Sequence, residues 1–237
     1  MHEYNLKRLV TVEVWGDFAC FAAPYGKVER LTYPFPTPSA ARGILSAIYM
    51  KPVEFYWQIR RIEVLNPIQY ISFKRNEVEC AVNGKDSIFT DEERTQRQTV
   101  ALRDVHYRIA ATVEPRCEEL RKRQNRKISM DAVHEQALRR VRTGKAYHQP
   151  GLGMREFVAY FEEAKADGKP PIDETIDAGF MVYDIFDFPR DMKVKKKPTP
   201  CLTLFHAVMD HGVIEVPPYD SPEVLKVNGT IMEGGGV

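Results

Sequence analysis

The sequence predicts an α+β fold, and three observations carry that prediction. Segments with strand periodicity and segments with helix periodicity follow one another as β-α-β, and again as β-α-β, over the first 162 residues. A polar, weakly patterned stretch, 75–98, separates the two halves and is interpreted as an inserted arm. Further β-like segments follow a linker. The first order is that of a ferredoxin-like (RRM-like) βαββαβ domain, here 1–163. The second part, 174–227, predicts a small antiparallel β-domain or a β-extension of the first sheet.

The first strand and the first helix are predicted within the first 52 residues. Apolar side chains alternate from Leu6 to Trp15, as on a half-buried strand. Thr37 is a natural N-cap, and Pro38 suits the first helical position because it lacks an amide hydrogen that would have no partner there. The helix is expected from about Ser39 to Tyr49, and Lys51-Pro52 ends it.

The other strands are predicted from β-branched and aromatic runs between chain breakers. Pro67 breaks the run that begins at Phe55, and Asn83-Gly84 gives the arm a hairpin-turn signal. The stretch 164–173 contains a glycine and two prolines and is interpreted as the linker. The expected strands are 55–65, 68–74, 99–113, 155–161, 179–186, 201–209 and 212–216, and 228–237 is expected to be a disordered tail.

The clearest element is a second helix, which begins after Ser129 and stops at Gly144. The Ser129 hydroxyl can accept a hydrogen bond from an unpaired amide of the first turn. Val133, Ala137 and Val141 recur at helical spacing and mark a buried face. Arginines crowd the last turn, and the loop beyond it carries glycine, aromatic and amide residues. A basic helix end followed by such a loop favours close backbone approach to phosphates.

The charge distribution points to a polyanionic partner more than the net charge does. The chain has a net charge of +1, which favours no partner class. From Arg116 to Lys145, however, there are ten Lys or Arg and four Asp or Glu, a local excess of +6. A second cluster of four lysines lies within 193–197. Such asymmetry is typical of nucleic-acid binders, although a solvated helix face and a surface loop would also produce it.

The cysteine spacing and the hydropathy bear on the cellular compartment, on metal binding and on membrane insertion. The four cysteines lie far apart and form no CxxC or Cys/His metal spacing, so we expect a reduced cytosolic protein with no cofactor. No stretch approaches 18 uninterrupted apolar residues, so no membrane span is expected. Asp17, Glu29 and Asp104 are scattered through the predicted elements, which disfavours a metal-dependent nuclease.

Six stretches spread over nearly the whole chain resemble one known family. They read GDFACF, YPFPTPSAARGILSAIYMKP, VLNPIQ, LRDVHYRI, LGMREF and HAVMDHGVI. In this order they resemble the CRISPR type I-C repeat-processing family (Cas five, subtype d). The helix end in that family reads Ile-Tyr-aromatic-Lys-Pro, and 48–52 follows it apart from Met50. No single motif is a catalytic fingerprint; the specificity comes from the shared order.

The resemblance implies an activity and a set of partners. The expected activity is metal-independent cutting of the CRISPR precursor transcript within each repeat, beside the repeat hairpin. The expected partners are the repeat hairpin, the mature guide RNA and the other subunits of the type I-C surveillance complex. Two alternatives stay open: an RNA-binding structural subunit that does not cut, and a general nucleic-acid-binding protein outside CRISPR biology.

The same resemblance implies the catalytic residues. Family members use a tyrosine at the end of the first helix and a lysine–histidine pair early in the second, which match Tyr49 and His134. The lysine position is Val133 here, and valine cannot offset charge on a phosphate. Either another cation supplies the charge, or the protein cuts slowly, or it binds without cutting. The candidate cations are Lys127, Arg139 and Lys145.

Both assignments have simpler alternatives. His134 also suits a surface or capping histidine, and Tyr49 also suits a side chain that closes the core at a helix end. His148, in the glycine-containing loop, is an alternative acid. In a ferredoxin-like fold the two helices pack roughly antiparallel on one face of the sheet. We therefore expect the end of the first helix to lie near the start of the second, with Tyr49 close to His134.

RNA binding is expected to use basic and glycine residues from several segments. Double-stranded RNA hides its base edges, so hairpin recognition is expected to depend on shape and phosphate contacts. The arm, 75–98, is expected to reach along the duplex or toward a partner subunit. The candidate RNA-binding residues are Lys27, Arg30, Lys127, Arg139, Arg140, Arg142, Lys145, His148, Gly151 and Gly153.

Overall fold

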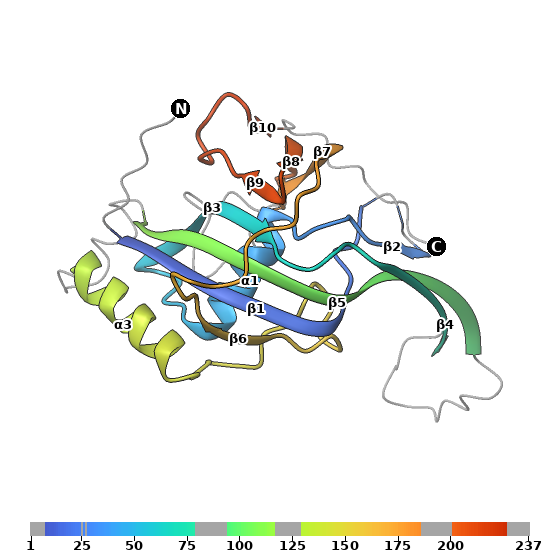
Figure 1. Cartoon of the computed structure of the whole chain (residues 1–237), viewed down its shortest axis with the longest axis horizontal. Helices are drawn as coiled ribbons and strands as arrows, with labels where there is room; N and C mark the ends of the chain where they lie inside the picture. The colour runs from blue at the N-terminus through green and yellow to red at the C-terminus, as the bar shows by residue number, and fades with distance from the viewer. Residues whose placement is uncertain are drawn as a thin grey trace, which may run out of the picture.

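The computed structural model describes residues 8–24, 26, 28–78, 94–116, 129–185 and 201–226. Its described part is a mixed α/β structure built on one large, mainly antiparallel sheet with two helices (Figure 1). The path through the sheet is β10-β8-β9-β3-β5-β1-β6, while β2 and β4 also pair with β5 and β7 pairs with β8. The strands are β1 (Leu9–Ala19), β2 (Arg30–Leu31), β3 (Phe55–Val64), β4 (Tyr70–Val78), β5 (Arg94–Pro115), β6 (Tyr160–Glu163), β7 (Ile176–Asp184), β8 (Thr203–Asp210), β9 (Val213–Glu215) and β10 (Leu225–Lys226).

The centre of the sheet is formed by β3, β5 and β1, whose apolar side chains face the helices. In β1 the even positions Val10, Val12 and Val14 are fully buried. In β3 the buried positions change parity after Ile59, where a bulge shifts the register to Arg61. The extra residue keeps the later apolar side chains of β3 on the core side, because side chains alternate between the two faces of a strand.

The first helix, α1 (Pro38–Ile48), forms as its sequence predicts. The Thr37 hydroxyl accepts a hydrogen bond from the amide of Ala40 at 3.1 Å, and Pro38 takes the first position. Ile44, Leu45 and Ile48 are almost completely buried against the sheet. Burial on this scale stabilises the helix by about 2 kcal/mol per large aliphatic side chain.

The second described helix, α3 (Met130–Arg142), also confirms its predicted limits. The Ser129 hydroxyl accepts from the amide of Ala132 at 3.4 Å, and the helix ends before Gly144, which has φ = +63°. Val133, Ala137 and Val141 are buried in the same core cluster as the apolar side chains of α1.

Two of the predicted strands differ from the structure. The strand expected over 155–161 is limited to β6, because the chain before it follows a turn fixed by an amide of Cys20 that donates to the carbonyl of Leu152. The short strand expected over 68–74 extends to Val78 and pairs with the beginning of β5. The arm is therefore a two-stranded ribbon that projects from the body of the protein (Figure 1). Its predicted Asn83-Gly84 turn lies outside the described residues.

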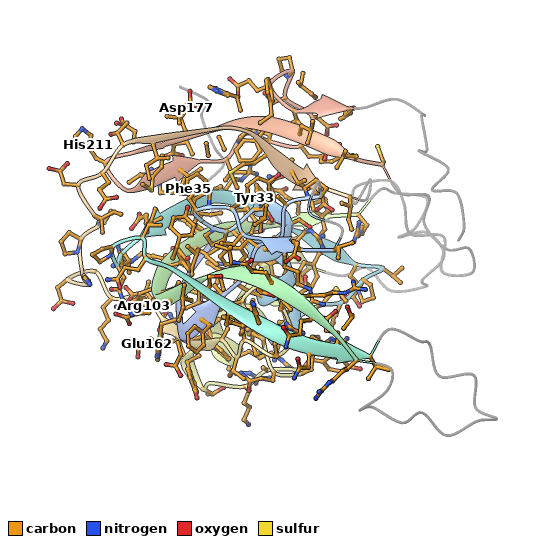
Figure 2. All side chains as sticks on the ribbon, turned by 90° about the vertical axis from the view of Figure 1, so that its right-hand side faces the viewer. Tyr33, Phe35, Arg103, Glu162, Asp177 and His211 are labelled. Carbon is orange, nitrogen blue, oxygen red and sulfur yellow. The ribbon has the colours of Figure 1, made fainter. Side chains whose placement is uncertain are left out.

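The C-terminal strands are hydrogen-bonded into the same sheet through β9, which pairs with both β8 and β3. Figure 2 shows Asp177 and His211 in this part, at one end of the molecule, with Arg103 and Glu162 toward the other. The predicted division into domains at the linker stays a prediction, as does the disordered tail, 228–237, which lies outside the described residues.

Candidate nucleic-acid interface

The candidate site forms where the end of α1 meets the second half of α3 and the loop after it. The carbonyls in the last turn of a helix have no partner within the helix. Here the amides of Tyr147 and His148 donate to the carbonyl of Ala47 at 2.8 and 3.2 Å. The Arg140 guanidinium donates to the carbonyl of Ile48 at 3.3 Å. These hydrogen bonds hold the loop after α3 against the last turn of α1, two residues before Tyr49 in the sequence.

Tyr49 is the C-cap of α1 and lies between the core and the surface. Its ring is 5% exposed and packs on Phe55, with 5.5 Å between the ring centroids. The Arg140 guanidinium carbon lies 5.3 Å from the centroid of the Tyr49 ring, within cation–π distance. The indole nitrogen of Trp57 donates to the Tyr49 carbonyl at 2.8 Å. These contacts fix both the backbone and the ring of Tyr49.

A second cation, Lys51, approaches Tyr49 from its hydroxyl side. Its ammonium group lies 3.0 Å from the Glu54 carboxylate. The pKa of Lys51 is raised, first by its hydrogen bond to Glu54 and also by its hydrogen bond to Tyr49. The phenolic oxygen of Tyr49 is therefore next to a permanently charged lysine at neutral pH. The sequence analysis treated Lys51 only as part of the helix end; its position two residues after Tyr49 was the available signal.

An open recess of about 790 Å³ lies beside Arg140. Arg139, Arg140 and Lys145 contribute the cations that border it, and Arg139 donates to the Gln136 side chain at 2.5 Å. Within the described part of the chain, none of these three cations forms an ion pair with a carboxylate. Their uncompensated charge gives the recess a positive potential, which suits the phosphates of a nucleic acid. The other residues that line it are Gln136, Thr143, Gly144 and Ala146.

Exposed aromatic side chains stand next to this recess. Tyr147 is 81% exposed, and its ring centroid lies 5.7 Å from that of the exposed His148. Neither ring is buried by its own fold, so both are available to stack on a base or contact a ribose.

His134 lies in a different environment from the one expected. Its Nε2 is 3.2 Å from the carbonyl oxygen of Leu9 on β1, and its Nδ1 is 3.8 Å from the Glu135 carboxylate. His134 precedes Arg140 by six residues, which corresponds to about 9 Å along the helix axis. The contacts described for Tyr49 do not include His134, so the expected closeness of these two residues stays a prediction. The end of α1 meets the second half of α3, because Arg140 and the 147–148 loop bind its terminal carbonyls.

Of the remaining RNA-binding candidates, some form ion pairs or line another recess, and others lie outside the described residues. Arg142 pairs with Glu163 at 3.0 Å, and Arg30 pairs with Glu77 at 3.1 Å, so both charges are partly neutralised. Gly151 and Gly153 line a separate recess of about 460 Å³ beside the first turn of α1. Lys27, Lys127 and the lysines of 193–197 lie outside the described residues.

The arm is fastened to the body by an ion-pair network that the sequence analysis did not identify. Glu77 on β4 lies 3.3 Å from Arg75 and 3.6 Å from Arg97, and it also holds Arg30. Arg75 pairs in turn with Glu156 in the turn before β6. The arm, β2 and this turn therefore form one charged cluster.

The described residues contain neither a metal site nor a membrane-spanning helix. No group of three or more His, Cys, Asp or Glu side chains is placed to hold a metal ion there. No helix in the described ranges is long and apolar enough to cross a membrane.

Comparisons with known proteins agree on one family. A family model described as "CRISPR-associated protein (Cas_Cas5)" matches residues 9–217. The chain is 36% identical over 227 residues to a CRISPR pre-crRNA endoribonuclease Cas5d of Thermus thermophilus, covering 91% of this chain and 94% of the relative. It is 36% identical over 240 residues to the protein of that name from Mannheimia succiniciproducens, covering 92% and 98%.

Solved structures share the fold. A CRISPR-associated protein superposes with a TM-score of 0.66 at 24% identity, covering 92% of this chain and 96% of the other. A functionally uncharacterized protein from Streptococcus mutans gives a TM-score of 0.62 at 22% identity, covering 92% and 97%. At these identities the likeness concerns the fold alone.

Proposed function

The chain belongs to the Cas5d family of CRISPR-associated proteins, and from this premise we propose that it binds the repeat hairpin of precursor CRISPR RNA and cuts it. Two relatives that match nearly the whole chain carry the name pre-crRNA endoribonuclease. The mature guide RNA and the other subunits of the surveillance complex are its proposed partners after cleavage.

The proposed reaction uses the ribose 2′-hydroxyl as the nucleophile and needs no metal. The 2′-oxygen loses its proton to a base and bonds to the adjacent phosphorus. The bond from phosphorus to the 5′-oxygen breaks, and that oxygen takes a proton from an acid. The products are a 2′,3′-cyclic phosphate and a free 5′-hydroxyl. Negative charge grows on the phosphate oxygens in the transition state, so a fixed cation accelerates the step.

The observation that carries this proposal is the recess beside Tyr49. Three cations without a carboxylate partner in the described part of the chain border it. One of them, Arg140, lies over the Tyr49 ring, and Lys51 bonds to the Tyr49 hydroxyl. We propose that the scissile phosphate lies here. The recess residues Arg139, Arg140 and Lys145 would contact the RNA backbone, together with His148 and, farther away, Arg30, Arg142 and the 151–153 turn.

Tyr49 and His134 are the proposed catalytic pair, as the family resemblance implies. The position of Tyr49 supports its part directly. The ring of His134 is restrained near the first turn of α3 by its contact with the Leu9 carbonyl, and its part follows from the family resemblance. His148 is the competing imidazole, since its backbone is fastened beside the end of α1 and its ring is exposed.

We also interpret the fold as ferredoxin-like. The order β3-β5-β1-β6, with α1 after β1 and α3 after β5, is the order that a βαββαβ domain requires. It supports the RNA-recognition assignment only by analogy, because one fold serves many functions.

The decisive test is cleavage of the organism's own repeat RNA in EDTA, with native protein, His134→Ala and His148→Ala. We expect native protein to cut at one position beside the hairpin and to leave a 2′,3′-cyclic phosphate. Loss of cutting in His134→Ala alone supports the family pair, and loss in His148→Ala alone moves the acid–base role to the loop. Cutting that requires added Mg²⁺ would contradict the metal-free reaction.

A second candidate function is an RNA-binding subunit that does not cut. The observation that favours it is Val133, which is 2% exposed where the family has a lysine. Tight binding of the hairpin by native protein without any cleavage would establish this second function.

A further inference from the structure

The position at which the family has a lysine is Val133 in this chain, and valine carries no charge. Another residue must therefore supply the cation beside the scissile phosphate. Val133 is 2% exposed and belongs to the core cluster together with Ala137 and Val141. The side chain at this position points into the apolar interior. A charged group here would lose its hydration unless it bent back to the surface.

Arg140 lies on nearly the same line of α3 as Val133, one residue before the buried Val141. It follows Val133 by seven residues, so it lies about 20° from the same line along the helix and about 10 Å farther on. At this end of the helix Arg140 contacts the Ile48 carbonyl and the Tyr49 ring. The cation over the ring of Tyr49 is therefore Arg140, while Lys51 meets its hydroxyl.

The guanidinium of Arg140 is held in place and still has donors to spare. One of its five N–H groups goes to Ile48, at 3.3 Å from Nη1, and its plane lies near the Tyr49 ring. No carboxylate pairs with it in the described part of the chain, and it borders the open recess. A planar group fixed in this way loses little freedom when it binds two phosphate oxygens.

On the premise of the proposed cleavage, we infer that Arg140 is a catalytic residue that stabilises the charge developing on the scissile phosphate, in place of the lysine that Val133 replaces. Its neighbours suit this task less well. Arg139 is bound to Gln136 and does not contact Tyr49. Lys51 bonds to the Tyr49 hydroxyl, but the Glu54 carboxylate at 3.0 Å offsets part of its charge. The positive charge is thus supplied by Arg140 in the second half of α3, two helical turns after Val133.

The test compares Arg140→Gln, Arg140→Lys and the matched control Arg139→Gln. The control removes one positive charge from the same recess without touching Tyr49. Cleavage is measured in EDTA under single-turnover conditions with saturating protein, so that weak binding does not limit the rate. Affinity is measured separately, on a repeat RNA with a 2′-deoxy nucleotide at the cut position.

Arg140→Gln should cut about 100-fold more slowly at saturation, the usual loss for one transition-state donor. Arg140→Lys should recover part of that rate, since it restores charge but not the bidentate geometry. Arg139→Gln should bind less tightly, and at saturation it should lose much less rate than Arg140→Gln does. Binding of the deoxy repeat by the Arg140 variants reports that they are folded.

Three outcomes would overturn the inference. A native cleavage rate for Arg140→Gln at saturation removes Arg140 from the reaction while leaving the proposed function intact. An Arg140→Lys rate no higher than that of Arg140→Gln assigns its effect to packing on Tyr49 and not to charge. If the native protein itself cuts no repeat RNA, the proposed function fails first and this inference fails with it.

Discussion

Gly153 shows how a single residue fixes the turn on which the site depends. Its φ is +83°, a conformation that side chains with a Cβ rarely adopt. A Cβ at this position would lie 2.0 Å from the carbonyl oxygen of Cys20, while the Cys20 amide donates to Leu152 next to it. The turn therefore lies directly on the end of β1. The sequence analysis assigned Gly153 to phosphate approach, whereas its clearest role in the structure is this close packing.

We predict that Gly153→Ala destabilises the protein by about 3 kcal/mol or more, since it combines an unfavourable φ with a backbone clash. Gly144→Ala is the matched control: Gly144 has φ = +63° but open space around its Cβ position, so it should lose only about 1 kcal/mol. Urea unfolding followed by tryptophan fluorescence measures both. If both variants lost the same free energy of unfolding, the backbone at Cys20 would be able to move away from the new methyl group of Gly153→Ala.

At the scale of elements, α3 carries two kinds of arginine on its last turns. Arg139 has no carboxylate partner in the described part of the chain, whereas Arg142 pairs with Glu163 at 3.0 Å. An arginine such as Arg139 can release its solvent counterions when it binds a phosphate, whereas Arg142 already has a carboxylate beside it. Arg139 and Arg142 can therefore be compared as two arginines of one helix that differ in whether a carboxylate pairs with them.

We predict that Arg139→Ala and Lys145→Ala each weaken repeat binding and lower the slope of log affinity against log salt concentration by about 0.7 to 0.9, the value for one phosphate contact. Arg142→Ala should lower that slope by less, because the Glu163 carboxylate already offsets part of its charge. Fluorescence anisotropy over a salt series measures the three slopes. A slope unaltered in Arg139→Ala would remove Arg139 from the RNA contacts.

The helices and the site differ in how far the sequence predicts them. Thr37, Pro38 and Ser129 act on amides within three residues, so both helix starts were predictable from local chemistry alone. The contact of Arg140 with Tyr49 joins residues 91 positions apart and depends on how α3 lies across the end of α1. The family resemblance selected Tyr49, but it could not show that Arg140 lies against its ring.

At the scale of the whole molecule, the C-terminal strands are joined to the first part by more than the sheet. Arg42 on α1 pairs with Asp184 on β7 at 2.8 Å, and the two side chains are 13% and 6% exposed. The side chain of Gln58 on β3 donates to the Tyr183 hydroxyl, which in turn donates to the carbonyl of Pro217. With β9 paired to both β8 and β3, these contacts argue that the two parts unfold together.

Asp184→Asn tests this cooperativity, because it removes the carboxylate charge that pairs with Arg42 in a largely buried place. We predict that it destabilises the protein by about 3 kcal/mol, as the loss of one partner of a buried ion pair does. Asp177→Asn, on the same strand but with a 61% exposed side chain, is the control and should cost less than about 0.5 kcal/mol. Native-state hydrogen exchange should report the loss at the amides of β1 and of β8 alike, since one cooperative unit shares its unfolding free energy. Faster exchange in β8 with β1 unchanged would instead show that the C-terminal strands unfold as the separate domain that the linker predicts.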